Sequence, residues 1–148
     1  MTAHSALRFE QLAPNIGARV TGVDLSLPLN EVAFGAIRQA FLDHLLLSFP
    51  GQNLPPPAQI AFTERFGAVE AHPLKARAGH PEYDNLLVLE NRPERRGARN
   101  DFWHSDITCA PTPPAATLLH AIEVPEGRGD TSFCNMYRAW QLLPDDLR

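Results

Sequence analysis

Apolar and polar positions alternate along two stretches near the beginning of the chain. Residues 7–12 and 18–25 follow this alternation, with Val and Thr in the second stretch, as expected of strands that bury one face. The segment Asn15-Ile16-Gly17 between them has the composition of a turn. The pattern therefore predicts that the chain opens with two strands joined by a turn.

The spacing of apolar residues becomes helical after Asn30, a favoured residue type for a helix N-cap. The residues that form one apolar stripe are Phe34, Ile37, Phe41 and Leu45. This stripe predicts an amphipathic helix over residues 31–44. The segment of residues 45–49 is short and largely apolar, and we expect it to form a buried strand.

A second helix is predicted after a loop at residues 51–57. Pro56 and Pro57 can occupy its first turn, and Gly67 is a suitable stop after Phe66. Beyond it, short apolar runs alternate with loops rich in Pro, Gly and Arg. We expect strands at residues 86–90, 117–123 and 130–133, and a last helix at residues 137–143 that ends before Pro144.

Strand candidates outnumber helices in this pattern, which predicts an α+β fold that is mainly β. A jelly roll with two flanking helices fits the pattern, and other α+β folds fit it equally well. With 148 residues, of which 44% are hydrophobic, the chain can form the core of one domain.

The charge balance narrows the class of partner. The chain has 13 Lys and Arg against 17 Asp and Glu, and this net charge of -4 argues against a nucleic-acid or anionic-membrane surface. Its first residues contain no apolar core of signal-peptide length and its aliphatic runs are too short to span a bilayer, so we expect a cytoplasmic protein with a small-molecule partner. Cys109 and Cys134 are expected to be reduced thiols packed as small apolar groups.

His104 and Asp106 have the spacing of a pair of metal ligands. In a strand, residues two apart project to the same face, so both side chains can reach one cation while Ser105 points away. Nitrogen and oxygen donors with open positions suit iron(II) in a site of two histidines and one carboxylate, and zinc accepts the same donors. Such a pair also arises readily by chance, so its context matters.

The motifs around this pair occur in a fixed order along the chain. They are residues 15–18 (NIGA), 22–25 (GVDL), 65–67 (RFG), 71–73 (AHP), 100–108 (NDFWHSDIT), 112–115 (TPPA) and 129–131 (GDT). In this order and over essentially the whole chain, the sequence resembles the taurine dioxygenase (TauD/TfdA) family. The resemblance implies a double-stranded β-helix, with residues 1–148 as the N-terminal part of a single dioxygenase domain.

The resemblance also implies roles for individual residues. In that family the His and Asp of the motif bind iron(II), which implies His104 and Asp106 as ligands, and Thr131 matches the Thr that contacts the cosubstrate 2-oxoglutarate. His72 and Asn100 match substrate-contacting residues. Lys75 stands where taurine dioxygenases carry a Tyr, which favours another small anion, such as a sulfonate, alkyl sulfate or aryloxyalkanoate. The implied reaction couples decarboxylation of 2-oxoglutarate by O2 to hydroxylation of this substrate.

Two family residues are missing from this pattern. Relatives take a second iron-binding His, and an Arg that pairs with 2-oxoglutarate, from the C-terminal half, and neither lies within these 148 residues. We therefore expect the chain alone to be inactive or unstable, and a truncated reading frame is favoured over a fragment or one part of a split gene. Homo-oligomer formation stays open for a full-length protein.

Two other functions stay open as well. A zinc hydrolase would use His104, Asp106 and a further histidine, such as His72 or His120, to activate water. A non-catalytic remnant would use the strands as an interaction module. Oxygen-dependent release of succinate would distinguish the dioxygenase from both.

Overall fold

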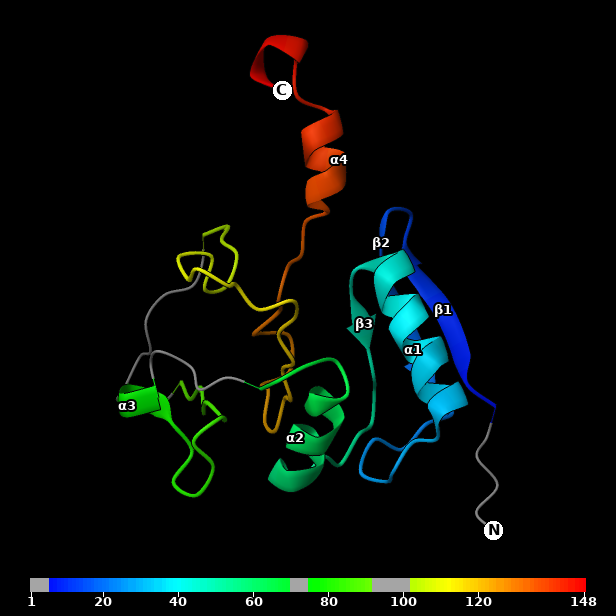
Figure 1. The fold of residues 1–148 in the computed structure, drawn as a ribbon, viewed down its shortest axis with the longest axis vertical. Helices are drawn as coiled ribbons and strands as arrows, with labels where there is room; N and C mark the ends of the chain where they lie inside the picture. Colours follow the sequence, from blue (N-terminus) through cyan, green and yellow to red (C-terminus); the bar gives the residue numbers. More distant parts are fainter. Residues whose placement is uncertain (1–5, 70–74, 92–101) are drawn as a thin grey trace. The chain divides into compact units, whose positions relative to one another are not determined.

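The computed structural model describes residues 6–69, 75–91 and 102–148. The chain divides into two compact units, the first made of residues 1–59 and 122–148 and the second of residues 60–121. The elements, labelled in Figure 1, are β1 (Arg8–Ala13), β2 (Ile16–Thr21), α1 (Glu31–His44), β3 (Leu47–Ser48), α2 (Pro56–Glu64), α3 (Lys75–Ala78), α4 (Met136–Gln141) and a 3-10 helix (Asp145–Leu147). Within the described ranges, no helix is both long and apolar enough to cross a bilayer.

Strands β1 and β2 form the antiparallel hairpin that the alternation predicts. Ala18 and Val20 are fully buried, while Arg19 between them is exposed, because successive side chains of a strand point to opposite faces. Pro14 and Asn15 make the turn, so β2 begins at Ile16, inside the predicted turn, and ends at Thr21. The two-strand opening is confirmed, with these shifted bounds.

Helix α1 packs against β2 and β3, and its bounds agree with the predicted helix. Its N-cap is also confirmed, because the Ala33 backbone N–H donates to the side-chain oxygen of Asn30 at 2.8 Å. The residues buried by the helix are Phe34, Ile37 and Ala40. Phe34 and Ile37 of the predicted stripe thus lie on the buried face, whereas Phe41 is half-buried and Leu45 follows the helix as its C-cap.

The third strand, β3, joins the sheet in parallel with β2. Ala18 pairs with Leu47 and Arg19 with Ser48, so β2 is the central strand. The expected strand at residues 45–49 is shorter than predicted, because Leu45 has a left-handed φ of 64° and ends α1. Leu47 is half-buried rather than buried.

The core lies on one side of this sheet, in the first unit. Its fully or almost fully buried apolar residues are Ala18, Val20, Leu25, Phe34, Ile37, Ala40 and Leu54. Gln52 fixes the loop after β3 to the chain beyond β2. Its amide oxygen accepts the Leu25 N–H at 2.8 Å and its amide nitrogen donates to the Val23 carbonyl at 3.1 Å. The backbone polar groups at this edge of the core are therefore satisfied.

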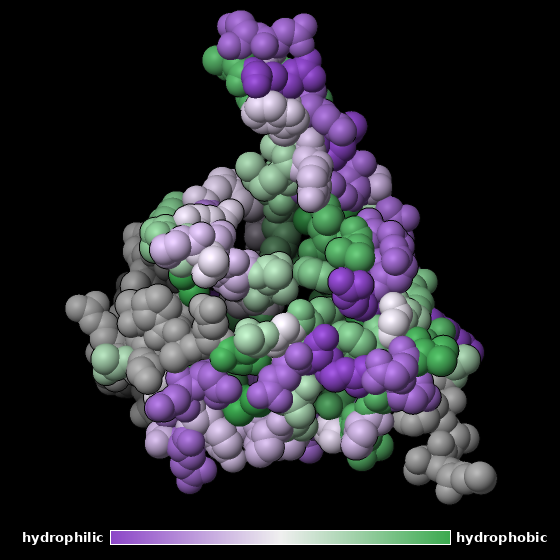
Figure 2. All heavy atoms as spheres, viewed as in Figure 1, coloured by the Kyte–Doolittle hydropathy of each residue, from purple (hydrophilic) through white to green (hydrophobic). Residues whose placement is uncertain are grey.

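Large apolar side chains later in the chain are exposed. Trp103 is 72% exposed, Ile122 87% and Trp140 54%. Hydrophobic residues, drawn in green, reach the surface in Figure 2. Among the described residues, the packed core is thus made by the first half of the chain, with Phe62 of α2 as the buried apolar residue of the second unit.

The strands predicted at residues 86–90, 117–123 and 130–133 are wrong for the structure described. Leu87 makes a single bridge with Gly79, and the other residues of these three ranges are irregular. A strand requires a neighbour to pair its backbone groups, and the sheet of the described residues consists of β1, β2 and β3. Helices outnumber strands among the described residues, so the α+β expectation holds in the form of a small sheet with a few helices. The expectation of a mainly β fold is wrong for these residues.

The predicted last helix is present as α4, which begins and ends slightly earlier than expected. Its N-cap is Asn135, whose side-chain oxygen accepts the Arg138 N–H at 3.1 Å. The amide nitrogen of the same side chain donates to the Asn15 carbonyl at 2.6 Å. One side chain therefore caps α4 and links it to the hairpin turn.

Candidate metal centre

His104 and Asp106 face each other in the second unit. His104 Nε2 lies 3.5 Å from Asp106 Oδ1. The segment is not the strand that was expected, because residues 103–105 are irregular and residues 106–109 form a turn. The two side chains still lie close together, but the alternation of side chains along a strand does not explain their approach.

The imidazole of His104 is oriented by its own backbone. Nδ1 lies 2.9 Å from the carbonyl oxygen of Phe102, two residues earlier. A carbonyl can only accept, so Nδ1 carries a proton in this contact, and in the neutral imidazole Nε2 is then the nitrogen with the lone pair. This is the arrangement found in metal-binding histidines, whose second nitrogen donates to an acceptor. In this structure the acceptor is the Phe102 carbonyl.

The carboxylate of Asp106 is held in a similar way. Its Oδ2 accepts a hydrogen bond from the hydroxyl of Thr117 at 3.0 Å, which leaves Oδ1 toward the imidazole. Thr117 was not identified as a site residue from the sequence. The reason is that it follows Asp106 by 11 residues and lies in an irregular segment, where no periodicity relates the two positions.

The two donors are open to solvent. The side chain of His104 is 42% exposed and that of Asp106 is 48% exposed, so a cation and further ligands can reach them. Among the residues that the structure describes, no group of three or more His, Cys, Asp or Glu is placed to hold a metal. The arrangement is a pair of donors that can supply part of a coordination shell.

The turn after Asp106 contains a strained residue. Ile107 has φ of 50°, and its carbonyl accepts the Ala110 N–H at 3.1 Å to close the turn. A left-handed conformation is rare for a β-branched residue and costs energy. This conformation directly follows the proposed carboxylate ligand, and such strain is often found at functional sites.

The other predicted site residues are placed less fully. Thr131 is exposed in an irregular segment of the first unit, after Gly129. His72 and Asn100 lie outside the described residues. Cys109 and Cys134 are free thiols, and both are exposed, so the expectation that they pack as apolar groups is wrong.

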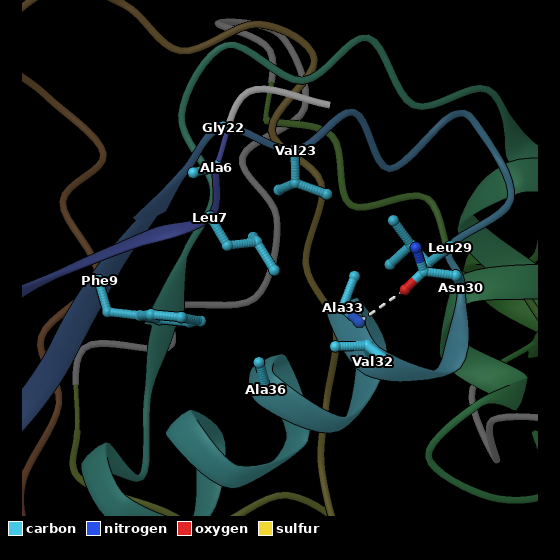
Figure 3. A pocket seen from close by; sticks show the side chains of 10 residues that line it. All are labelled: Ala6, Leu7, Phe9, Gly22, Val23, Leu29, Asn30, Val32, Ala33 and Ala36. Carbon is cyan, nitrogen blue, oxygen red and sulfur yellow. Dashed lines mark hydrogen bonds between the residues drawn. The ribbon is translucent and has the colours of Figure 1, made fainter. Parts of the chain in front are cut away.

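An apolar groove in the first unit offers no comparable chemistry. It has a volume of about 370 Å³ and lies between the start of β1 and the N-terminal turns of α1. Figure 3 shows Leu7, Phe9 and Val32 around it, with the Asn30–Ala33 cap at its edge. None of its lining residues is a His, Cys, Asp or Glu. The candidate site is therefore the pair in the second unit.

Comparison with known proteins decides the family. The sequence matches the family described as "Taurine catabolism dioxygenase TauD, TfdA family" over residues 8–148. The chain belongs to the TauD/TfdA family. This family consists of iron(II)- and 2-oxoglutarate-dependent dioxygenases, and the resemblance stated from the motifs is confirmed.

Several members of the TauD/TfdA family are similar to the chain. It is 33% identical over 150 residues to an alpha-ketoglutarate-dependent sulfate ester dioxygenase of Pseudomonas putida, covering 99% of this chain and 48% of that protein. It is 32% identical over 151 residues to an alpha-ketoglutarate-dependent 2,4-dichlorophenoxyacetate dioxygenase of Cupriavidus pinatubonensis, covering 93% and 53%. The chain thus spans about half the length of these relatives.

A solved structure of a taurine dioxygenase from Burkholderia xenovorans is 30% identical to the chain, with a TM-score of 0.48. The matched region covers 53% of this chain and 28% of the chain in that structure.

The donors of the site fit the metal of the TauD/TfdA family. One imidazole nitrogen and one carboxylate oxygen are two of the three donors in a site of two histidines and one carboxylate. In His104 the other ring nitrogen, Nδ1, already contacts the Phe102 carbonyl, and in Asp106 the other oxygen, Oδ2, already accepts from Thr117. The residues present can therefore hold iron(II) in part.

Proposed function

We propose that this chain supplies two protein ligands, His104 Nε2 and Asp106 Oδ1, to the iron(II) centre of a 2-oxoglutarate-dependent dioxygenase. The observation that carries the proposal is their 3.5 Å approach, with Phe102 and Thr117 bound to the opposite atoms. Membership of the TauD/TfdA family supports it. A zinc hydrolase would use the same two donors, but no observation on the chain favours that alternative.

In this proposal, bound iron(II) with 2-oxoglutarate and O2 supplies the oxidising power to hydroxylate a C–H bond of the substrate. The residues of the chain hold the metal and leave coordination positions open. The exposed hydroxyl of Thr131 can donate to an anion, and we assign it to a carboxylate of 2-oxoglutarate. A second iron-binding His and an Arg that pairs with 2-oxoglutarate complete the site in a double-stranded β-helix.

The proposed substrate is a small organic anion that is hydroxylated next to a heteroatom. The two relatives that support this class are named for a sulfate ester and for 2,4-dichlorophenoxyacetate. His72 and Asn100 are assigned to substrate contact on the strength of the sequence motif. The reaction would take place in the cytoplasm.

Metal binding by the 148-residue chain tests the proposal directly. Mn(II), a stand-in for iron(II) that is stable in air, can be titrated while the free ion is followed by electron paramagnetic resonance. We expect His104→Ala to abolish specific binding. The matched control is His120→Ala, which removes a half-buried histidine of the same unit and should leave binding unchanged. Binding that depends on His120 instead would favour the zinc-type site and contradict the proposal.

A further inference from the structure

The hydroxyl of Thr117 has a specific relationship to the proposed ligand Asp106. We propose that Thr117 is a positioning residue that holds Asp106 as a ligand through one oxygen only. The proposal rests on the proposed function, since it concerns the same metal pair. It adds a residue that neither the motif nor the spacing of the pair identifies.

The geometry supports a positioning role in three steps. The Thr117 hydroxyl donates to Oδ2 of Asp106 at 3.0 Å, which is a normal hydrogen-bond length to a carboxylate. The other oxygen, Oδ1, is then the one that lies 3.5 Å from His104 Nε2. Rotation of the carboxylate, which would exchange its two oxygens, breaks the bond to Thr117.

The same bond limits how the carboxylate can bind a cation. A free carboxylate can chelate a metal through both oxygens, and it then occupies two coordination positions. An oxygen that already accepts a hydrogen bond on its own side is a poorer second donor. Thr117 therefore favours a single Asp106–metal bond, which leaves a position open for the chelating cosubstrate or O2.

The backbone after Asp106 contributes to this arrangement. The turn at residues 106–109 is closed by the bond from Ala110 N–H to the Ile107 carbonyl at 3.1 Å. Phe102 holds the imidazole from the other side of the pair. His104 and Asp106 are thus each held by one hydrogen bond from outside the proposed coordination shell, and outer partners of this kind tune metal affinity.

The experiment compares two substitutions at Thr117 in the full 148-residue chain. Thr117→Val keeps the shape of the side chain and removes the hydroxyl, whereas Thr117→Ser keeps the hydroxyl. Thr112→Val is the matched control, because it removes an exposed threonine hydroxyl elsewhere in the same unit. Affinity for Mn(II) alone is measured by electron paramagnetic resonance, and the coordination of Co(II) alone by its visible absorption spectrum.

We expect Thr117→Val to weaken Mn(II) binding by about 10-fold, as loss of an outer hydrogen-bond partner typically does. The Co(II) spectrum should change in the same variant, because Asp106 becomes free to chelate. Thr117→Ser and Thr112→Val should retain both the affinity and the spectrum. Since Thr117 is exposed, the fold should survive, and equal circular dichroism of all variants checks this.

The possible failures are distinguishable. If His104→Ala and Asp106→Ala do not alter metal binding, the proposed function fails and the role of Thr117 with it. If those two variants lose binding while Thr117→Val keeps the parent affinity and spectrum, the positioning role alone is wrong. Equal loss in Thr117→Val and Thr117→Ser would also overturn it, because the serine retains the donor.

Discussion

His104 Nε2 lies 3.5 Å from Asp106 Oδ1, and this approach places an imidazole and a carboxylate donor within reach of one cation. Each side chain is held at its other polar atom, His104 by the Phe102 carbonyl and Asp106 by the Thr117 hydroxyl. The donors that remain free are therefore turned toward each other before any metal binds. Pre-orientation of this kind reduces the conformational entropy that metal binding would otherwise cost.

Replacing the carboxylate of Asp106 by an amide of the same size tests whether its negative charge contributes to metal binding. Asp106→Asn keeps the size of the side chain and removes the negative charge that attracts a divalent cation. We expect Mn(II) affinity to fall by more than the roughly 10-fold that loss of an outer partner causes. Asp130→Asn removes another exposed carboxylate, which lies in the first unit, and should have no effect. Equal binding by Asp106→Asn and the parent chain would refute Asp106 as a ligand.

The packing of α1 on the sheet makes a prediction about stability. Ile37 is fully buried, so Ile37→Ala leaves a cavity and should lower the free energy of unfolding by about 2–5 kcal/mol. Val32 lies in the same helix with 84% of its side chain exposed, and Val32→Ala should stay within about 0.5 kcal/mol of the parent. Urea denaturation measures both, and similar losses for the two variants would contradict the assigned face of α1.

The C-terminal end of α1 leads to a prediction about the relative stability of a glycine and an alanine variant at Leu45. Leu45 has φ of 64°, where a Cβ atom is strained and glycine is not. Leu45→Gly and Leu45→Ala lose similar packing, so their difference reports the backbone. We expect the glycine variant to be more stable by about 1 kcal/mol, opposite to the usual preference for alanine in a helix. An alanine variant as stable as the glycine variant would show that this cap is not left-handed.

Asp24 provides a prediction about pH. The Ser26 hydroxyl, at 2.6 Å, and the Ser26 backbone N–H, at 2.9 Å, both donate to Asp24 Oδ1 and hold the pKa of this carboxyl below its ordinary value of 3.8. A group whose pKa is lowered in the folded state stabilises the fold above its unfolded pKa. That contribution is lost as the pH falls through the folded pKa.

Removing the serine hydroxyl tests this assignment. Ser26→Ala should raise the pKa of Asp24 toward 3.8, because the larger of the two lowering causes is gone. The pKa is measured by following the Asp24 side-chain carbon by nuclear magnetic resonance as the pH is lowered. Ser48→Ala, at an exposed serine in β3, is the control and should leave it unchanged. No change in the pKa of Asp24 in Ser26→Ala would rule out the hydrogen bond as its cause.

Local signals in the sequence were enough for the hairpin and for α1 with its Asn30 cap. Each depends on interactions between residues close in the chain, such as the Ala33 N–H with Asn30 or the alternation that buries Ala18. The motif around His104 also identified the family, because several motifs kept a fixed order.

Only the tertiary structure shows which strands pair with one another and which distant side chains form hydrogen bonds. The parallel pairing of Leu47 with Ala18 and the absence of strands at residues 117–123 depend on which backbone groups find a neighbour, and local patterns do not specify that. The Thr117–Asp106 hydrogen bond is of the same kind, since it joins residues without regular structure between them. The sequence thus identified the two side chains that we propose as metal ligands, and the folded chain determined which polar atom of each is already hydrogen-bonded.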